Sequence, residues 1–230
     1  MSSRDHGDSA GYPLLRLFHL VSPAVPIGAY AYSQGLEYAV QAGWVHDEAS
    51  TFDWLSGLAC HALGTLDLPI LLRLHRAWHA HDAVAVQYWT QWLIAARETA
   101  ELRAEEQHLG RALARVLVEL ELVEASAWRD ATPAWATLFA LAAARWDIGE
   151  RATLSGYLWS WSENQLLAAV KLVPLGQSAG QRVLHQLIAG MPAIVERARG
   201  VDDADISVAT VSQALASAQH ESQYTRLFRS

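Results

Sequence analysis

Three histidines that lie close together are the residues in this sequence best suited to hold a metal ion. His75 and His79 are one helical turn apart, and His81 follows two residues later. Imidazole nitrogens suit nickel and zinc, but a lasting site needs further ligands, and no cysteine lies near these three. We therefore expect a solvated or core-edge position for all three and no stably bound metal. A nickel site built from them is the alternative.

Other catalytic chemistry finds no support in the sequence. The only lysine, Lys171, is followed by Leu172, so the Gly-Lys-Ser/Thr ending of a nucleotide-binding loop is absent. His220-Glu221 stands alone, without the second histidine of a zinc hydrolase motif. The single cysteine, Cys60, is expected to be a buried and inert thiol. These residues predict a protein without a catalytic site of its own.

The composition limits which partners the protein can bind and in which cellular compartment we expect it. Of 230 residues, 52% are hydrophobic, which is enough for a sizeable core, and the net charge is -7. An acidic chain does not attract nucleic acid. No secretory signal begins the chain, no long uncharged run is apolar enough to span a membrane, and one cysteine cannot form an internal disulfide. We expect a cytoplasmic protein that binds neither nucleic acid nor membrane.

Helix-favouring residues dominate the sequence, and proline or glycine interrupts them at intervals that suit separate helices. The predicted fold is all-α. A single compact multi-helix domain covers residues 13–219, a disordered lead-in covers residues 1–12, and a partner-docking tail covers residues 220–230. Asp47 and Ser50 are candidate N-caps. Helices are expected at Leu14–Val21, from near Gly28 to Gly43, after Ser50, in two or three segments between Pro69 and Gln91, and at Trp135–Arg145, Leu154–Val173 and Gln177–Ala189.

One charged segment, RETAELRAEEQHLG over residues 97–110, has the pattern of an exposed helix. Arg97 precedes Glu101 by four residues and Arg103 precedes Glu106 by three, which is the spacing of ion pairs along a helix surface. We expect a solvated face here, and a surface for a partner is the alternative.

Several segments far apart in the chain resemble signature segments of the UreF family of urease accessory proteins. They are SPAVPIGAYAYSQGLEYAV (22–40), ARETAELRAEEQHLG (96–110), VKLVPLGQSAGQRVL (170–184) and HESQYTRLFRS (220–230). One departure is Ala29, where many relatives have a second glycine. The resemblance implies a homodimeric helical protein that binds UreD, called UreH in some organisms, and thereby recruits the GTPase UreG to apo-urease. It implies no cofactor of its own, because UreG binds the GTP and the complex handles the nickel.

Polar and aromatic residues in these segments are the predicted partner-binding residues: Pro26, Gly28, Tyr30, Ser33, Glu37, Gln177, Gln181, Arg182, Glu221, Tyr224, Arg226, Leu227 and Phe228. For Ser33 and Glu37, one helical turn apart, internal hydrogen bonding is the alternative. Tyr224, Leu227 and Phe228 have helical spacing and are residue types that anchor interfaces. We therefore expect the tail to dock on UreD rather than on the chain's own core.

Two other functions remain open from the sequence. A strict GTPase-activating protein would supply Gln177, Gln181 or Arg182 to the active site of UreG. An independent nickel chaperone would instead use the three clustered histidines.

Overall fold

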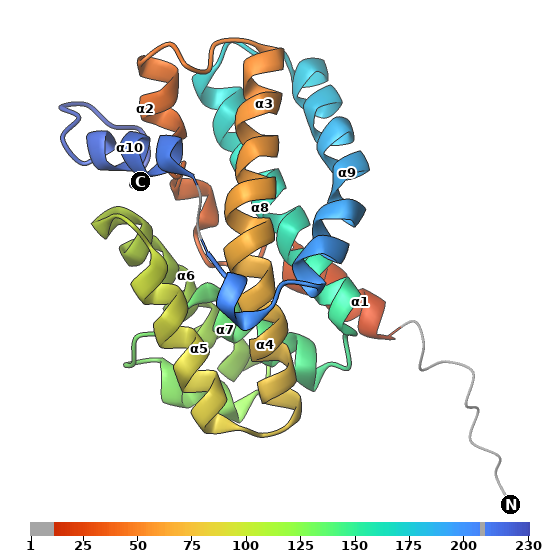
Figure 1. The fold of residues 1–230 in the computed structure, drawn as a ribbon. Coiled ribbons are helices and arrows are strands. Elements are labelled where there is room, and N and C mark those ends of the chain that lie inside the picture. The colour runs from red at the N-terminus through yellow and green to blue at the C-terminus, as the bar shows by residue number, and fades with distance from the viewer. Residues whose placement is uncertain (1–11, 208–209) are drawn as a thin grey trace, which may run out of the picture.

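The computed structural model describes residues 12–207 and 210–230, and these residues form helices joined by turns (Figure 1). No strand occurs in these two ranges, which confirms the all-α prediction. The predicted disordered lead-in lies, except for Tyr12, outside the described residues. The helices are α1 (Tyr12–Val21), α2 (Leu36–Gln41), α3 (Glu48–Leu58), α4 (Leu68–His79), α5 (Ala83–Ala96), α6 (Ala100–Glu119), α7 (Trp135–Arg145), α8 (Glu150–Leu172), α9 (Gln177–Arg199) and α10 (Val211–His220), with shorter helical turns η1 (Ala29–Ala31), η3 (Val123–Trp128) and η4 (Asp203–Asp205).

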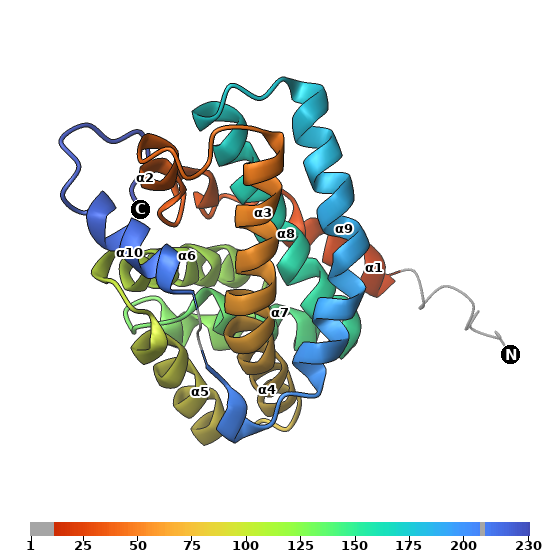
Figure 2. The ribbon, with the colours of Figure 1, turned by 45° about the horizontal axis from the view of Figure 1, so that its top comes forward.

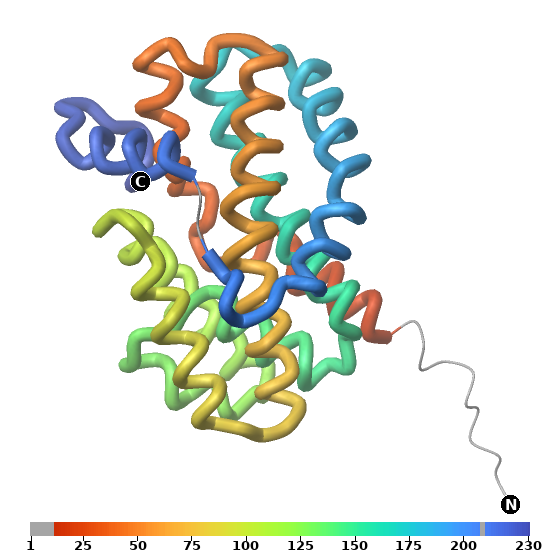
Figure 3. The backbone as a smooth tube through the Cα atoms, in the orientation of Figure 1, coloured from red at the N-terminus to blue at the C-terminus, as the bar shows by residue number. Residues whose placement is uncertain are grey.

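A continuous helical rod runs through the middle of the molecule, as the backbone tube in Figure 3 shows. It consists of α3, a π-helical segment at Ala59–Asp67, and α4. A capping box fixes its start: the Ser50 amide donates to the Asp47 carboxylate at 2.8 Å, and the Asp47 amide donates to the Ser50 hydroxyl at 3.0 Å. Asp47 is therefore the N-cap, as predicted, and Ser50 is its reciprocal partner.

This rod, Glu48–His79, is long and apolar enough by composition to cross a membrane. A search for uncharged runs misses it because Asp67 interrupts the apolar stretch. However, 72% of its most apolar window is buried inside the fold. The neighbouring helices therefore already cover the apolar surface of the rod.

The other helices surround the rod on several sides (Figure 1, Figure 2). α9 packs along α3 and also against α8, while α5, α7 and α8 contact α4. α7 is buried along almost its whole length, and its Trp135 ring stacks on Tyr157 of α8 at a centroid distance of 4.2 Å. Phe139 meets the same tyrosine edge to face at 5.3 Å. This aromatic cluster fixes α7 against α8 at the centre of the core.

A buried ion cluster connects the rod to α6, where the sequence predicts a solvated face. The Arg97 guanidinium donates to Glu106 at 2.7 Å and to Asp67 at 3.2 Å, and the side chains of both carboxylates are at most 6% exposed. Arg103 donates to the Arg97 carbonyl instead of pairing with Glu106. The predicted surface pairs are wrong because Arg97 lies before α6 and turns inward to the π-helical segment.

The helix predicted from near Gly28 to Gly43 is also wrong, because the chain breaks twice within it. The turn η1 ends at Ala31, and α2 starts only at Leu36. Between them, Gln34 and Gly35 have positive φ angles of 54° and 84°. A Cβ on Gly35 would lie 2.9 Å from the Ser217 nitrogen, so only glycine admits this close approach of α10.

Two further boundaries differ from the sequence prediction. α9 continues through Pro192 to Arg199, ten residues beyond its predicted end at Ala189. Downstream of α10, the chain ends in turns rather than in a helix, although helical spacing was expected for the tail. In contrast, the bounds of α7 match the predicted Trp135–Arg145.

Replacing Arg97 tests how strongly the buried ion cluster stabilises the fold. Arg97→Met leaves Asp67 and Glu106 buried together without a cation, and we expect the free energy of unfolding to fall by about 3–5 kcal/mol. Urea denaturation measures this change. Arg182→Met is the matched control because it breaks an exposed pair with Glu48, so its stability should barely change. Equal effects of the two substitutions would contradict a structural role for the cluster.

Candidate partner-binding site

The C-terminal tail folds back onto the body between α2 and α6 (Figure 2). Two backbone hydrogen bonds hold its end against the first signature segment: the Arg229 amide donates to the Ala31 carbonyl at 2.9 Å, and the Ser33 amide donates to the Ser230 carbonyl at 2.7 Å. The Ser33 hydroxyl donates to the same carbonyl at 2.6 Å. Residues almost two hundred positions apart thus form one site.

The Glu37 carboxylate is the main acceptor for the tail. The amides of Leu227 and Phe228 donate to its two oxygens at 2.7 and 2.9 Å. His220 lies fully buried between two carboxylates, with one ring nitrogen 3.2 Å from Glu37 and the other 2.7 Å from Glu101. We call Ser33, Glu37, Glu101, Glu105 and His220 the tail clamp.

Glu105 closes the clamp from the side of α6. Its carboxylate accepts a hydrogen bond from Gln34 at 2.7 Å and one from the Ser230 hydroxyl at 2.8 Å. Gln34 in turn accepts from the Trp161 indole at 2.8 Å. Burial raises the pKa of Glu105 to about 7, although both hydrogen bonds act to lower it. A buried carboxyl that titrates near neutral pH therefore contacts the end of the tail.

The tail docks on the chain's own body, which corrects the expectation that it docks on a partner instead. Phe228 is only 5% exposed and packs with α2 and the end of α8. The predicted shared helical face of Tyr224, Leu227 and Phe228 is also wrong, because α10 ends at His220. The docked tail nevertheless leaves Leu227 66% exposed and Tyr224 fully exposed.

The charged tail residues face α6. Arg226 donates to Glu101 at 2.6 Å, and Glu221 accepts a long hydrogen bond from the Glu101 amide at 3.4 Å. The alternative of internal hydrogen bonding for Ser33 and Glu37 describes their contacts in the free chain. The predicted role of these residues in binding a partner stays a prediction.

The three predicted residues before Ser33 lie on an accessible turn. Pro26 is exposed, and Tyr30 is 65% exposed. Gly28 has a φ angle of 78°, and a Cβ built on it would meet nothing within 4 Å. The glycine is therefore required by the left-handed turn rather than by a close neighbour within the chain.

Gln177, Gln181 and Arg182 lie on a separate surface at the start of α9. Both glutamines are exposed. Arg182 forms a two-pronged pair with Glu48 at 2.6 and 2.9 Å, which connects α9 to the start of α3. The structure does not bring these residues to the tail clamp.

The clustered histidines do not converge on one point. The buried His75 has its Nε2 2.8 Å from the Ile148 carbonyl, and its ring contacts that of His79 at a centroid distance of 4.8 Å. His81 lies beside the Arg145 guanidinium at 3.3 Å. Within the described ranges, no group of three His, Cys, Asp or Glu side chains is arranged to hold a metal ion.

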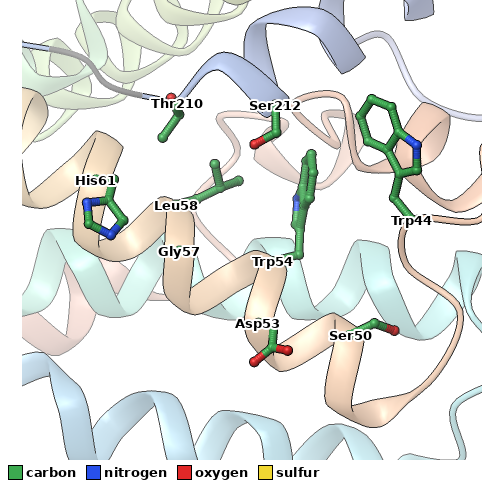
Figure 4. A pocket seen from close by; sticks show the side chains of 9 residues that line it. All are labelled: Trp44, Ser50, Asp53, Trp54, Gly57, Leu58, His61, Thr210 and Ser212. Carbon is green, nitrogen blue, oxygen red and sulfur yellow. The ribbon is translucent and has the colours of Figure 1, made fainter.

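A hollow of about 480 Å³ lies between α3 and the start of α10 (Figure 4). Trp54 extends from α3 toward Ser212, and its ring lies 6.3 Å from that of Trp44, whereas Asp53 points the other way. The hollow is lined by none of the predicted partner-binding residues. It therefore lies apart from the tail clamp.

Glu101, Glu105 and His220 belong to the tail clamp but are not among the residues predicted from the sequence to bind a partner. One signal was present: Leu102, Leu109 and their neighbours form an apolar stripe on α6, and Glu105 occupies a position within that stripe. A glutamate in an apolar stripe indicates a buried carboxylate that needs donors. No local pattern marks His220, because its partners lie more than a hundred residues away.

The fold and the site define an all-helical protein whose C-terminal tail is fixed on its body beside an exposed turn. A family model described as UreF matches residues 45–188. A urease accessory protein UreF from Alkalilimnicola ehrlichii is 52% identical over 216 residues, covering 94% of this chain and 95% of that protein. Proteins of the same name from Teredinibacter turnerae and Hahella chejuensis are 48% and 44% identical, each covering 94% of this chain and 98% of the relative. The chain belongs to the UreF family of urease accessory proteins.

Glu105 makes the stability depend on pH in a definite direction. The folded chain holds the Glu105 proton up to about pH 7, whereas the ordinary glutamate pKa is 4.5. The protonated Glu105 carboxyl therefore stabilises the fold fully below pH 4.5, its pKa in the unfolded chain. This stabilisation is lost as the pH rises through about 7, its pKa in the folded chain. Between about pH 5 and pH 8, we expect the free energy of unfolding of the wild type to fall by up to about 3 kcal/mol relative to that of Glu105→Gln, which has no proton to lose. Urea denaturation across this range measures the free energies of unfolding. The same pH dependence in the wild type and in Glu105→Gln would contradict the prediction.

Removing the main acceptor should release the tail. In Glu37→Ala, the Leu227 and Phe228 amides lose their acceptor, so we expect trypsin to cut after Arg226 at least about tenfold faster, since even one charge-assisted hydrogen bond contributes about 1.5–3 kcal/mol. Mass spectrometry of timed digests measures this rate. Glu48→Ala is the control, because it frees only the exposed Arg182. Unchanged cleavage in Glu37→Ala would show that the clamp does not hold the tail.

Proposed function

We propose that this chain is a scaffold for urease maturation that binds UreD, or UreH, and through that complex recruits and regulates the GTPase UreG on apo-urease for nickel insertion. Membership of the UreF family supports this role. In the proposal the chain works in the cytoplasm, catalyses no covalent step and binds no cofactor stably. UreG binds the GTP, and the assembled complex handles the nickel.

The observation that carries the proposal is the presentation of Tyr224 and Leu227 on a fixed tail. A large side chain on a mobile terminus loses conformational freedom when it binds, which weakens the complex. Here Glu37 and the buried Phe228 already hold the backbone on both sides of Leu227. Leu227 is therefore arranged in advance as an anchor for UreD, and the exposed Tyr224, three residues before it, is the second anchor in the proposal.

A second exposed apolar face supports the proposed homodimer. α1 carries the side chains of Tyr12, Leu14, Leu15 and Phe18, each at least half exposed. Arg16 lies among them with its guanidinium over the Tyr12 ring, and a row of large exposed apolar residues has the character of an interface between identical subunits. We assign this face to a second copy of the chain, apart from the tail that faces UreD.

The two alternative functions have less support from the arrangement of their residues. Strict GTPase activation by Arg182 would require its guanidinium to leave Glu48, with which it forms two hydrogen bonds. A nickel chaperone built on the clustered histidines would require His75 to leave the Ile148 carbonyl. Neither rearrangement is needed by the scaffold.

The scaffold proposal predicts that the exposed tail residues control binding to UreD. We expect Tyr224→Ala with Leu227→Ala to weaken binding at least about tenfold, because two interface anchors are lost, while the thermal unfolding midpoint stays unchanged. The measurement is pull-down of co-expressed UreD from the same organism, quantified by titration.

The control is Tyr88→Ala with Val84→Ala, which removes two exposed apolar side chains of α5, outside the tail and the tail clamp. This variant should retain UreD fully. Equal retention by both double variants would remove the tail from the interface, and failure of the wild-type chain to retain UreD would contradict the scaffold itself.

A further inference from the structure

A pocket beside the tail contains arginines that pair with no carboxylate among residues 12–207 and 210–230. It is a hollow of about 240 Å³ between α6, the turn before α2 and the end of the tail. Its polar lining comprises Tyr30, Tyr32, His108, Arg111, Arg115 and Arg229. We call it the arginine pocket.

The charge in this pocket is unlike that of the rest of the chain. The net charge is -7, and nine arginines in the described ranges form ion pairs with carboxylates. Arg111, Arg115 and Arg229 form no such pair within those ranges. Arg16, Arg103 and Arg197 form none either, but each donates to a tyrosine hydroxyl or a backbone carbonyl and lies outside the pocket. Three cations that share one hollow repel one another, and an anion placed among them removes that repulsion.

The fold fixes these groups in place. His108, Arg111 and Arg115 follow one another at intervals of three and four residues, so they lie on the same face of α6. The backbone amide of Arg229 donates to the Ala31 carbonyl at 2.9 Å, which brings this arginine to the pocket.

The polar groups of the pocket are linked to one another. The Tyr32 hydroxyl lies 3.1 Å from His108 Nδ1. Partial burial lowers the pKa of His108, and the charges of Arg111 and Arg229 lower it further. The positive charges of Arg111 and Arg229 therefore act on the His108 ring, and an anion bound beside it would offset them.

From this geometry we propose that the arginine pocket binds a phosphate-class oxyanion. A guanidinium donates two parallel hydrogen bonds to phosphate or carboxylate oxygens. A single carboxylate has one charge and two oxygens, which is too few for three guanidinium groups. A phosphate group carries about −1.5 to −2 charges and three acceptor oxygens, and a diphosphate carries more.

The size of the pocket agrees with this class of ligand. Its volume lies just below the roughly 300–1,000 Å³ of pockets that enclose drug-sized molecules, so it accepts one or two phosphate groups. Exposed Tyr30 at its rim offers an aromatic face for a group attached to the phosphate. The ligand is therefore either inorganic phosphate or the phosphates of a nucleotide. This inference does not depend on the scaffold proposal.

Isothermal titration calorimetry of the whole chain with pyrophosphate tests the pocket directly. We expect binding by the wild type and at least about tenfold weaker binding by Arg111→Gln, since a charge-assisted pair of hydrogen bonds is lost. Arg115→Gln changes an exposed side chain and should show the same direction, so it serves if Arg111→Gln does not fold. Arg151→Gln, an exposed arginine outside the pocket, is the control and should bind within about twofold of the wild type.

Three further measurements distinguish a nucleotide from inorganic phosphate, locate the ligand in the pocket, and test whether an acidic peptide binds instead. GTP that binds more tightly than pyrophosphate, with the same dependence on Arg111, identifies a nucleotide, whereas equal or weaker binding identifies inorganic phosphate. The ring signals of His108 are identified in the NMR spectrum by their absence in His108→Gln. A shift of these signals on adding pyrophosphate places the ligand in the pocket. Failure of pyrophosphate to bind, equal weakening by Arg151→Gln, or binding of a hexaglutamate peptide in its place would overturn the proposal.

Discussion

The need of two largely buried carboxyl groups, those of Glu37 and Glu105, for hydrogen-bond partners determines how the C-terminal tail meets the body of this protein. Glu105 is 5% exposed and the Glu37 side chain is 12% exposed, and a buried carboxyl group without hydrogen-bond partners is costly. The tail supplies the donors: two backbone amides reach Glu37, and the Ser230 hydroxyl reaches Glu105. Docking of the tail then buries Phe228 against α2 and α8 and brings Arg229 to the arginine pocket. The tail clamp therefore supports both the proposed anchors on the tail and the arginine pocket.

A second buried network holds the other side of α6. Arg97 connects Asp67, at the end of the π-helical segment, to Glu106, which is adjacent to Glu105 in the sequence. One turn of α6 thus directs one carboxylate toward the rod and the other toward the tail. Because both networks share this turn, the position of α6 relative to the rod also sets the position of the tail. Packing of small and aromatic side chains in α7 and α8 supplies the remaining rigidity.

Local patterns predict local structure in this chain, and contacts between distant segments escape them. The helical class, the N-cap at Asp47 and the bounds of α7 follow from residues that are neighbours in the sequence. The same spacing rule misled for Arg97, whose partners are Asp67 and Glu106 rather than Glu101, four residues ahead. The tail clamp could not be predicted, since Glu37 and Leu227 are 190 positions apart. Resemblance in the first and last signature segments marked both halves of the site without showing that they touch.

Amide hydrogen exchange in the isolated wild-type chain would show whether the tail is docked on the body before a partner binds. In the structure the free chain already holds its tail on Glu37, before any partner binds. NMR-detected exchange should therefore show strong protection of the Leu227 and Phe228 amides and little protection of the Tyr224 amide, for which the described residues offer no acceptor. Exchange of the Leu227 and Phe228 amides at the rate of an unstructured peptide would contradict the account, because the tail would then order only on a partner.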